Sequence, residues 1–145
     1  MPLQDDQTIA PDAVLLRVIP NYPNWTAIEG GRVRPTSLAF FSDNQEISYF
    51  IDGPGMRTEL GRIFSGNNAA LVPASVVREQ GFAIERRPGE CPEDFRCDRS
   101  SHVVAGPVAE MARKAHQGLA RRIARHPEVT IIRLSTQASE HEPQV

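Results

Sequence analysis

The chain of 145 residues is poor in several kinds of residue and segment, and each scarcity excludes a class of protein. Its two cysteines, Cys91 and Cys97, are too few for the disulfide framework of a small secreted domain. No apolar run approaches the roughly 20 residues that span a bilayer. The acidic start MPLQDDQT also differs from the basic-then-apolar pattern of a secretory signal. We therefore expect a cytoplasmic protein that does not contact a membrane.

Lysine is also scarce, since Lys114 is the only one among 16 lysines and arginines. The guanidinium of arginine is planar and permanently charged, which suits two-pronged contacts with carboxylates or phosphates. The net charge is −2, so the field of the whole molecule does not attract a polyanion, and nucleic acid is disfavoured as a partner. The last expected helix still carries five cations off its apolar stripe that could contact RNA or an acidic protein: Arg113, Lys114, Arg121, Arg122 and Arg125.

Several catalytic and nucleotide-binding signatures are missing as well. The chain contains no G-x-S-x-G elbow, no Walker loop, no G-x-G-x-x-G fingerprint and no H-E-x-x-H pair. The sequence therefore names no reaction and no cofactor, and it leaves open whether the protein is an enzyme.

The spacing of apolar residues predicts one α+β domain over residues 12–135. Helical spacing predicts about three helices, at 56–64, 73–80 and 108–126, of which the last is the longest. We expect a mostly antiparallel mixed sheet, with the long helix packed on one of its faces. Short branched or aromatic runs predict the strands, at 14–19, 38–41, 47–51, 69–72, 82–85, 102–105 and 129–134.

Three further segments are expected to lie outside this core. Residues 1–11 and 136–145 are polar or contain proline, so both are expected to be flexible tails. Residues 87–101 have little apolar content and are expected to form a surface loop. The runs 38–41 and 47–51 are expected to pair as a hairpin through the turn SDNQE.

A group of polar residues before run 38–41 is the first candidate site. Pro35 pushes Arg34 into an extended conformation, so Arg34, Thr36 and Ser37 are expected at the rim of the sheet. There, one guanidinium and two hydroxyls can converge on a phosphate or carboxylate. A solvated rim with a hydroxyl bonded to a local amide explains the same residues.

Arg17 is the second candidate, because it shares one side of its strand with Leu15 and Ile19. A partly buried guanidinium is costly unless it meets a carboxylate or the anionic group of a ligand. Both alternatives remain open, since four carboxylates are available as internal partners: Glu29, Asp43, Glu46 and Asp52.

His102 opens a strand that ends at a Gly-Pro pair, so its side chain can reach both the sheet interior and solvent. We single it out as the candidate catalytic acid or base, with a bond to a neighbouring backbone group as the structural alternative. Of the other histidines, His116 is expected on a helix surface, His126 as a cation at the helix end and His141 in the tail.

The segment between Cys91 and Cys97, with Asp98 and His102 nearby, carries zinc-ligand residue types. Its spacing of five intervening residues is not that of common structural zinc sites. Free thiols, a local disulfide and zinc therefore remain as interpretations, and we expect no metal site.

Two segments resemble those of a group of small uncharacterised bacterial proteins: RPTSLAF at 34–40 and the histidine strand HVVAG at 102–106. This resemblance brings no activity with it. A fainter resemblance is to compact ADP-ribosyltransferase-like domains, carried by LLR at 15–17 and PTS at 35–37. It implies that Arg17 faces a phosphate of a dinucleotide and that the hydroxyls orient its sugar or nicotinamide. The late glutamate of such domains has no counterpart in 129–134.

Together these residues predict a pocket for an anion or nucleotide, a phosphate-bearing small molecule, with an ADP-ribosyltransferase-like reaction as one form of it. Its expected members are Arg17, Arg34, Thr36 and Ser37 as binding residues and His102 as the catalytic residue. The alternative is a non-catalytic module that contacts a protein partner through the aromatic loop 22–25 or the arginines of the last helix.

Overall fold

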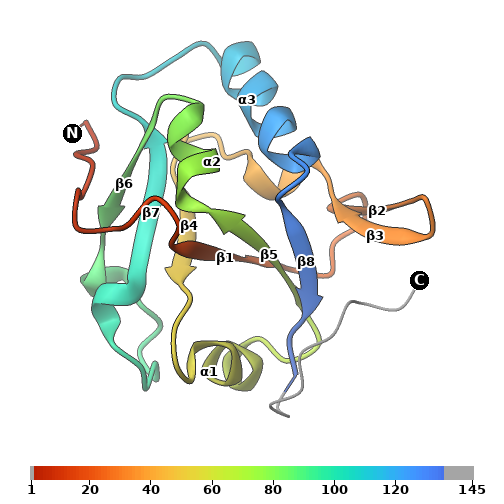
Figure 1. Ribbon diagram of the computed structural model, residues 1–145, viewed down its shortest axis with the longest axis vertical. Helices are drawn as coiled ribbons and strands as arrows, with labels where there is room; N and C mark the ends of the chain where they lie inside the picture. Colours follow the sequence, from red (N-terminus) through yellow and green to blue (C-terminus); the bar gives the residue numbers. More distant parts are fainter. Residues whose placement is uncertain (1, 136–145) are drawn as a thin grey trace.

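The computed structural model describes residues 2–135 and shows an α+β fold, as the sequence predicts (Figure 1). Six strands form one antiparallel sheet in the order β6-β7-β4-β1-β5-β8, and β2 and β3 form a separate ribbon. The strands of the large sheet are β1 (Val14–Ile19), β4 (Ile47–Ile51), β5 (Asn68–Pro73), β6 (Phe82–Arg86), β7 (His102–Pro107) and β8 (Thr130–Arg133). The ribbon consists of β2 (Thr26–Glu29) and β3 (Arg32–Pro35), and the helices are α1 (Met56–Ile63), α2 (Ala74–Glu79) and α3 (Arg113–Arg125).

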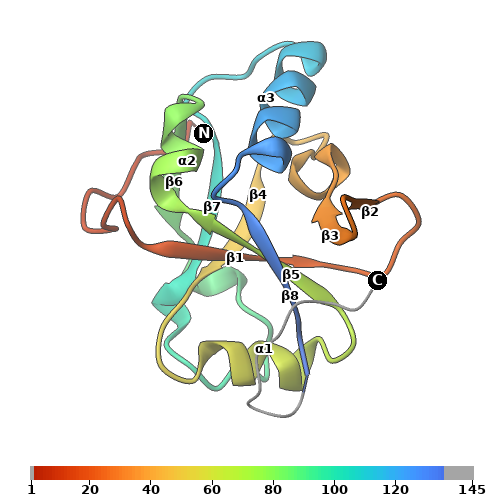
Figure 2. The ribbon, with the colours of Figure 1, turned by 45° about the vertical axis from the view of Figure 1, so that its right-hand side comes forward.

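Successive residues of each strand point to opposite faces of the sheet. Other elements of the chain cover both of these faces. On one face, Leu15 and Tyr49 pack against α2, α3 and a 3₁₀ turn, η1 (Ser37–Phe40). On the other face, Leu16 and Phe50 pack against α1 and the segment that carries Phe95. Figure 2 shows α1 on one side of the sheet and α2 and α3 on the other. None of the α-helices within residues 2–135 has the length and apolar character needed to cross a bilayer.

The two neighbours of β1 are paired with it to different extents. β5 pairs along all six residues of β1, from Val14 to Ile19. β4 pairs only with Leu15 and Leu16. Beyond Leu16 the ladder between β1 and β4 therefore ends, inside the sheet rather than at its edge.

The expected hairpin between 38–41 and 47–51 is wrong. Residues 37–40 form the turn η1, with Ala39 and Phe40 fully buried in the core beside α3. β4 pairs with β1 and β7 instead. An apolar run of four residues can be buried by one helical turn as well as by a strand, and periodicity cannot separate the two.

The expected free N-terminal tail is also corrected, because residues 2–11 pack along β6. Leu3 and Ile9 are buried, and Asp6 N donates to the carbonyl of Ile84 at 2.8 Å. Two ion pairs hold the segment, Arg78 with Asp5 and Arg86 with Asp6. Residues 136–145, the expected C-terminal tail, and His141 lie outside the described residues.

Two expectations for the last helix and the loop before β7 change as well. α3 begins at Arg113 rather than at 108, and His116 is fully buried rather than on the surface. The expected surface loop 87–101 contains the buried Phe95, whose ring lies 5.4 Å from that of Phe50. This segment covers part of the sheet despite its low apolar content.

Candidate functional site

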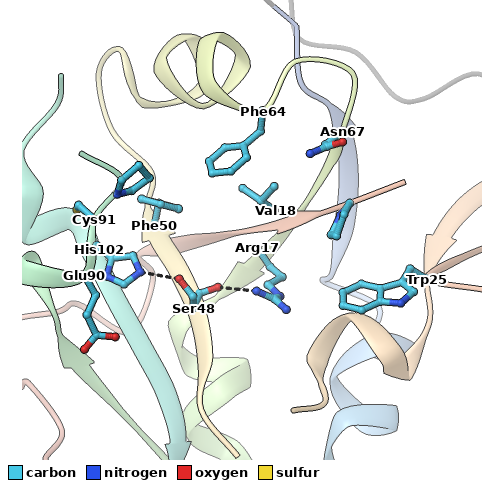
Figure 3. A pocket seen from close by; sticks show the side chains of 12 residues that line it. Arg17, Val18, Trp25, Ser48, Phe50, Phe64, Asn67, Glu90, Cys91 and His102 are labelled. Atoms are coloured by element: carbon cyan, nitrogen blue, oxygen red, sulfur yellow. Dashed lines mark hydrogen bonds between the residues drawn. The ribbon is translucent and has the colours of Figure 1, made fainter. Parts of the chain in front are cut away.

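A pocket of about 580 Å³ opens where β1 and β4 separate (Figure 3). Its volume lies in the range of small-molecule sites, about 300 to 1,000 Å³. One half of the lining is apolar: Val18, Pro20, Trp25, Phe50, Phe64 and Pro92. The other half is polar: Arg17, Ser48, Asn67, Glu90, Cys91 and His102.

Arg17 bridges the separated strands at this point. Its Nε donates to the carbonyl of Ala39 at 2.8 Å, and its Nη1 donates to the carbonyl of Ser48 at 3.3 Å. Burial lowers the pKa of Arg17, although its interaction with Tyr49 opposes the change. A guanidinium remains protonated in proteins, so the pocket contains a permanent positive charge in poorly hydrated surroundings.

This charge has no carboxylate partner in the described part of the chain. Arg17 meets two main-chain carbonyls, and no ion pair within residues 2–135 includes it. The structural ion pair considered from the sequence is therefore not formed there. Three of the four carboxylates offered for it pair with other arginines: Asp43 with Arg113, Glu46 with Arg87 and Asp52 with Arg57.

Ser48 and His102 form a hydrogen-bonded pair in the same pocket. His102 begins β7 and is 3% exposed, and its Nε2 lies 2.6 Å from Ser48 Oγ. Its Nδ1 lies 2.8 Å from the carbonyl oxygen of Arg87. Phe50, which lies opposite His102 in the β4–β7 ladder, packs edge-on at 5.1 Å between ring centroids.

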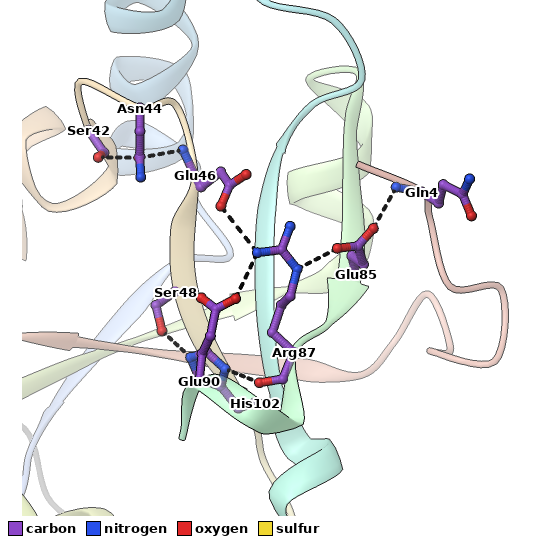
Figure 4. Close-up of polar contacts among 9 residues, drawn as sticks. All are labelled: Gln4, Ser42, Asn44, Glu46, Ser48, Glu85, Arg87, Glu90 and His102. Carbon is purple, nitrogen blue, oxygen red and sulfur yellow. Dashed lines mark hydrogen bonds and ion pairs between the residues drawn. The ribbon is translucent and has the colours of Figure 1, made fainter. Parts of the chain in front are cut away.

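The main chain of Arg87 is held firmly against His102. Arg87 N donates to the His102 carbonyl at 2.8 Å, so the two residues are linked by main chain and by imidazole. The Arg87 side chain lies among three carboxylates, as Figure 4 shows, and hydrogen bonds to Glu85 and Glu90 raise its pKa. The three are Glu46, Glu85 and Glu90. The ion pairs and the main-chain hydrogen bond hold Arg87 in place, and with it the carbonyl that accepts a hydrogen bond from His102 Nδ1.

The structure brings together Arg17 and His102 of the five residues expected in one pocket. The other three, Arg34, Thr36 and Ser37, are not among its lining residues, which corrects the expected arrangement. Thr36 Oγ1 donates to the carbonyl of Asn24 at 2.6 Å, and Ser37 begins η1. Arg34 donates to three carbonyls at the end of α3 and before β8, those of Ala124, His126 and Val129. Its guanidinium thus joins β3 to α3, because it satisfies carbonyls that the helix end leaves unpaired.

Sequence reasoning missed Ser48, Asn67 and the wall formed by residues 90–92. A serine within an alternating strand carries no local signal, because its partner His102 is distant in the sequence and the order of the strands was not predicted. Trp25, which belongs to the aromatic loop 22–25 expected as a protein-contact surface, lines the pocket. The separation of β1 from β4, which creates the pocket, has no signature in the sequence.

The two cysteines are free thiols. Burial raises the pKa of both, which favours the thiol over the reactive thiolate. Cys91 Sγ donates to the carbonyl of Arg99 at 3.4 Å and Cys97 Sγ to that of Gly55 at 3.7 Å. Within residues 2–135, no group of three His, Cys, Asp or Glu side chains is placed to hold a metal ion.

Comparisons of the chain with protein-family models, with curated proteins and with solved structures found no match.

Proposed function

We propose that the protein binds a small molecule with a flat or apolar group and an anionic group, a phosphate or a carboxylate, in the pocket around Arg17. The observation that carries the proposal is the guanidinium of Arg17, which lines a pocket of about 580 Å³ without an ion-pair partner within residues 2–135. A poorly hydrated charge gains most from a ligand of opposite charge, since solvent screens it weakly.

The rest of the lining supports a ligand with both characters. Trp25, Phe50 and Phe64 offer aromatic surface for a flat group. Asn67, Ser48 and His102 offer polar contacts at defined positions. Nucleotides and aromatic carboxylates share this chemistry. NAD⁺ belongs to the same class, so the transferase reaction suggested by resemblance falls within the proposal.

Thermal-shift and calorimetric titrations with AMP, NAD⁺ and indole-3-acetate test the proposal. A ligand at 100 times its Kd stabilises the native state by about 2.7 kcal/mol, which raises the midpoint of unfolding by several degrees. Adenosine, which lacks the anion, and inorganic phosphate, which lacks the flat group, should give smaller shifts. Release of nicotinamide from NAD⁺, followed in the same samples, tests the transferase form.

The substitution Arg17→Gln should weaken binding of any compound that gives a shift by about 10- to 100-fold, because a hydrogen bond to a charged group contributes about 1.5–3 kcal/mol. Arg78→Gln is the matched control. Arg78 also donates to two backbone carbonyls, of Asp6 and Ile9, but it lies outside the pocket lining. Equal affinities of wild type and Arg17→Gln, or no shift with any of the compounds, would contradict the proposal.

A protein-contact surface is the second candidate, and the exposure of two large apolar residues favours it. Tyr22 and Ile28 are each 61% exposed, and the ring of Tyr22 stands edge-on to Trp25 at 5.6 Å. Aromatic residues of this kind anchor interfaces. A protein that responds to none of the compounds but loses a partner on Tyr22→Ser would favour this candidate.

A further inference from the structure

We propose that Ser48 is a nucleophile, activated by His102, that cleaves a carboxylic ester bound in this pocket by acyl transfer to water. The inference rests on the proposed ligand pocket and adds a reaction to it. It starts from three groups in a row: Ser48 Oγ, the imidazole of His102 and the carbonyl of Arg87 (Figure 4).

The contacts of His102 define which nitrogen acts as base. A carbonyl oxygen only accepts hydrogen bonds, so Nδ1 carries the proton and donates to the Arg87 carbonyl at 2.8 Å. In a neutral imidazole Nε2 then has the free lone pair, and Ser48 Oγ donates to it at 2.6 Å. A nucleophile bonded to a base that a third group orients is the arrangement that activates a hydroxyl. Here a main-chain carbonyl takes the place of a carboxylate as the orienting group.

The surroundings keep this arrangement rigid and give a substrate access to it. The Arg87 carbonyl is fixed because Arg87 N pairs with the His102 carbonyl at 2.8 Å. Ser48 and His102 both line the pocket, beside the aromatic rings that would hold the apolar part of an ester. The guanidinium of Arg17 donates to the carbonyl of Ser48 and so lies beside the main chain of this residue. From there its positive charge can stabilise an oxyanion. Figure 3 shows His102, Ser48 and Arg17 in sequence across the pocket.

The first step forms a bond between Ser48 Oγ and the carbonyl carbon of the ester while the hydroxyl proton moves to His102 Nε2. The tetrahedral intermediate then collapses, the bond to the alcohol oxygen breaks, and the departing alcohol takes the proton from Nε2. In the second step water gives a proton to Nε2 and its oxygen attacks the acyl carbon. Ser48 Oγ leaves and recovers the proton from Nε2, and the released acid gives its own proton to solvent to become the carboxylate.

The experiment treats the full chain with an alkyl fluorophosphonate and maps the adduct by mass spectrometry. Attack by Ser48 forms an Oγ–P bond and expels fluoride, and the hydroxyl proton leaves through His102. One adduct per chain, located on Ser48, is expected. Hydrolysis of p-nitrophenyl acetate should show a burst of one equivalent of p-nitrophenol. Ser48→Ala should abolish both signals, and His102→Gln should slow labelling by at least about 100-fold.

Ser42→Ala is the control, because Ser42 Oγ also makes a short hydrogen bond, 2.7 Å to Asn44, but lies outside this pocket. It should label at the wild-type rate. Thermal unfolding of each variant shows whether it is folded; if His102→Gln is not, the adduct site and Ser48→Ala decide the result.

An adduct elsewhere, or a burst that survives Ser48→Ala, would overturn the inference. Ligand shifts that depend on Arg17 without labelling of Ser48 would overturn the reaction alone, whereas labelling of Ser48 without any shift would overturn the proposed ligand class alone.

Discussion

At the scale of single residues, His116 shows that a histidine can be buried where the spacing of apolar residues predicts an exposed position. It is fully buried in α3 between the rings of Phe41 and Phe82, at 5.1 and 5.9 Å, and neither ring nitrogen has a hydrogen-bond partner. The apolar residues at helical spacing in this helix, such as Ala115, Leu119 and Ile123, leave histidine out of the expected buried stripe. The structure buries His116, Ala120, Ile123 and Ala124 and leaves Leu119 partly buried, so the buried face keeps Ile123 and turns toward His116.

Burial lowers the pKa of His116, and this predicts a pH-dependent loss of stability. Below the ordinary value of 6.5 the unfolded chain takes up a proton that the native state resists. As the pH decreases further, the free energy of unfolding decreases by up to about 1.4 kcal/mol per pH unit until the native-state pKa is reached. His116→Leu removes this term, so the variant should gain stability over the wild type between about pH 6.5 and 5. Urea unfolding across that range measures it, and parallel pH profiles for the two proteins would refute it.

At the scale of elements, two helical glycines should respond to alanine with opposite signs. A Cβ on Gly61 of α1 would lie 1.8 Å from the carbonyl oxygen of Ser135, whereas a Cβ on Gly118 of α3 would meet nothing within 4 Å. Gly61→Ala should therefore destabilise the protein by about 1–3 kcal/mol or more through overpacking. Gly118→Ala should stabilise it by up to about 1 kcal/mol, because alanine is the better helix former. Chemical unfolding of both variants gives the two values, and a neutral Gly61→Ala would show that α1 does not pack closely on the chain after β8.

Elements were predictable where their apolar pattern was long or clear. Each of the strands β1, β4, β5, β6, β7 and β8 overlaps a run predicted from the sequence. Gly81, which follows α2, has a positive φ of 84°, the conformation that glycine favours after a helix. The ribbon β2–β3 was not, because its strands are mostly exposed and carry no alternation. Residues 2–11 were missed since they are held by ion pairs to Arg78 of α2 and Arg86 of β6, which lie far along the chain.

At the scale of the whole molecule, the candidate site depends on the order of the strands. Arg17, Ser48 and His102 come from β1, β4 and β7, three neighbours in the sheet. The sequence identified Arg17 and His102 from their chemistry, since a cation and an imidazole within apolar runs need partners. It could not identify Ser48, because only the pairing of β4 with both other strands places this hydroxyl between them.

The central claim is that Arg17, which has no carboxylate partner among residues 2–135, presents its charge to ligands in the pocket between β1 and β4. Diffraction from crystals soaked in selenate tests it directly, because the anomalous signal of selenium locates the anion without assuming a particular ligand. The account predicts a selenate within hydrogen-bonding distance of the Arg17 guanidinium, inside the pocket. A pocket without selenate in crystals whose exposed arginines on α3 bind it would contradict the account.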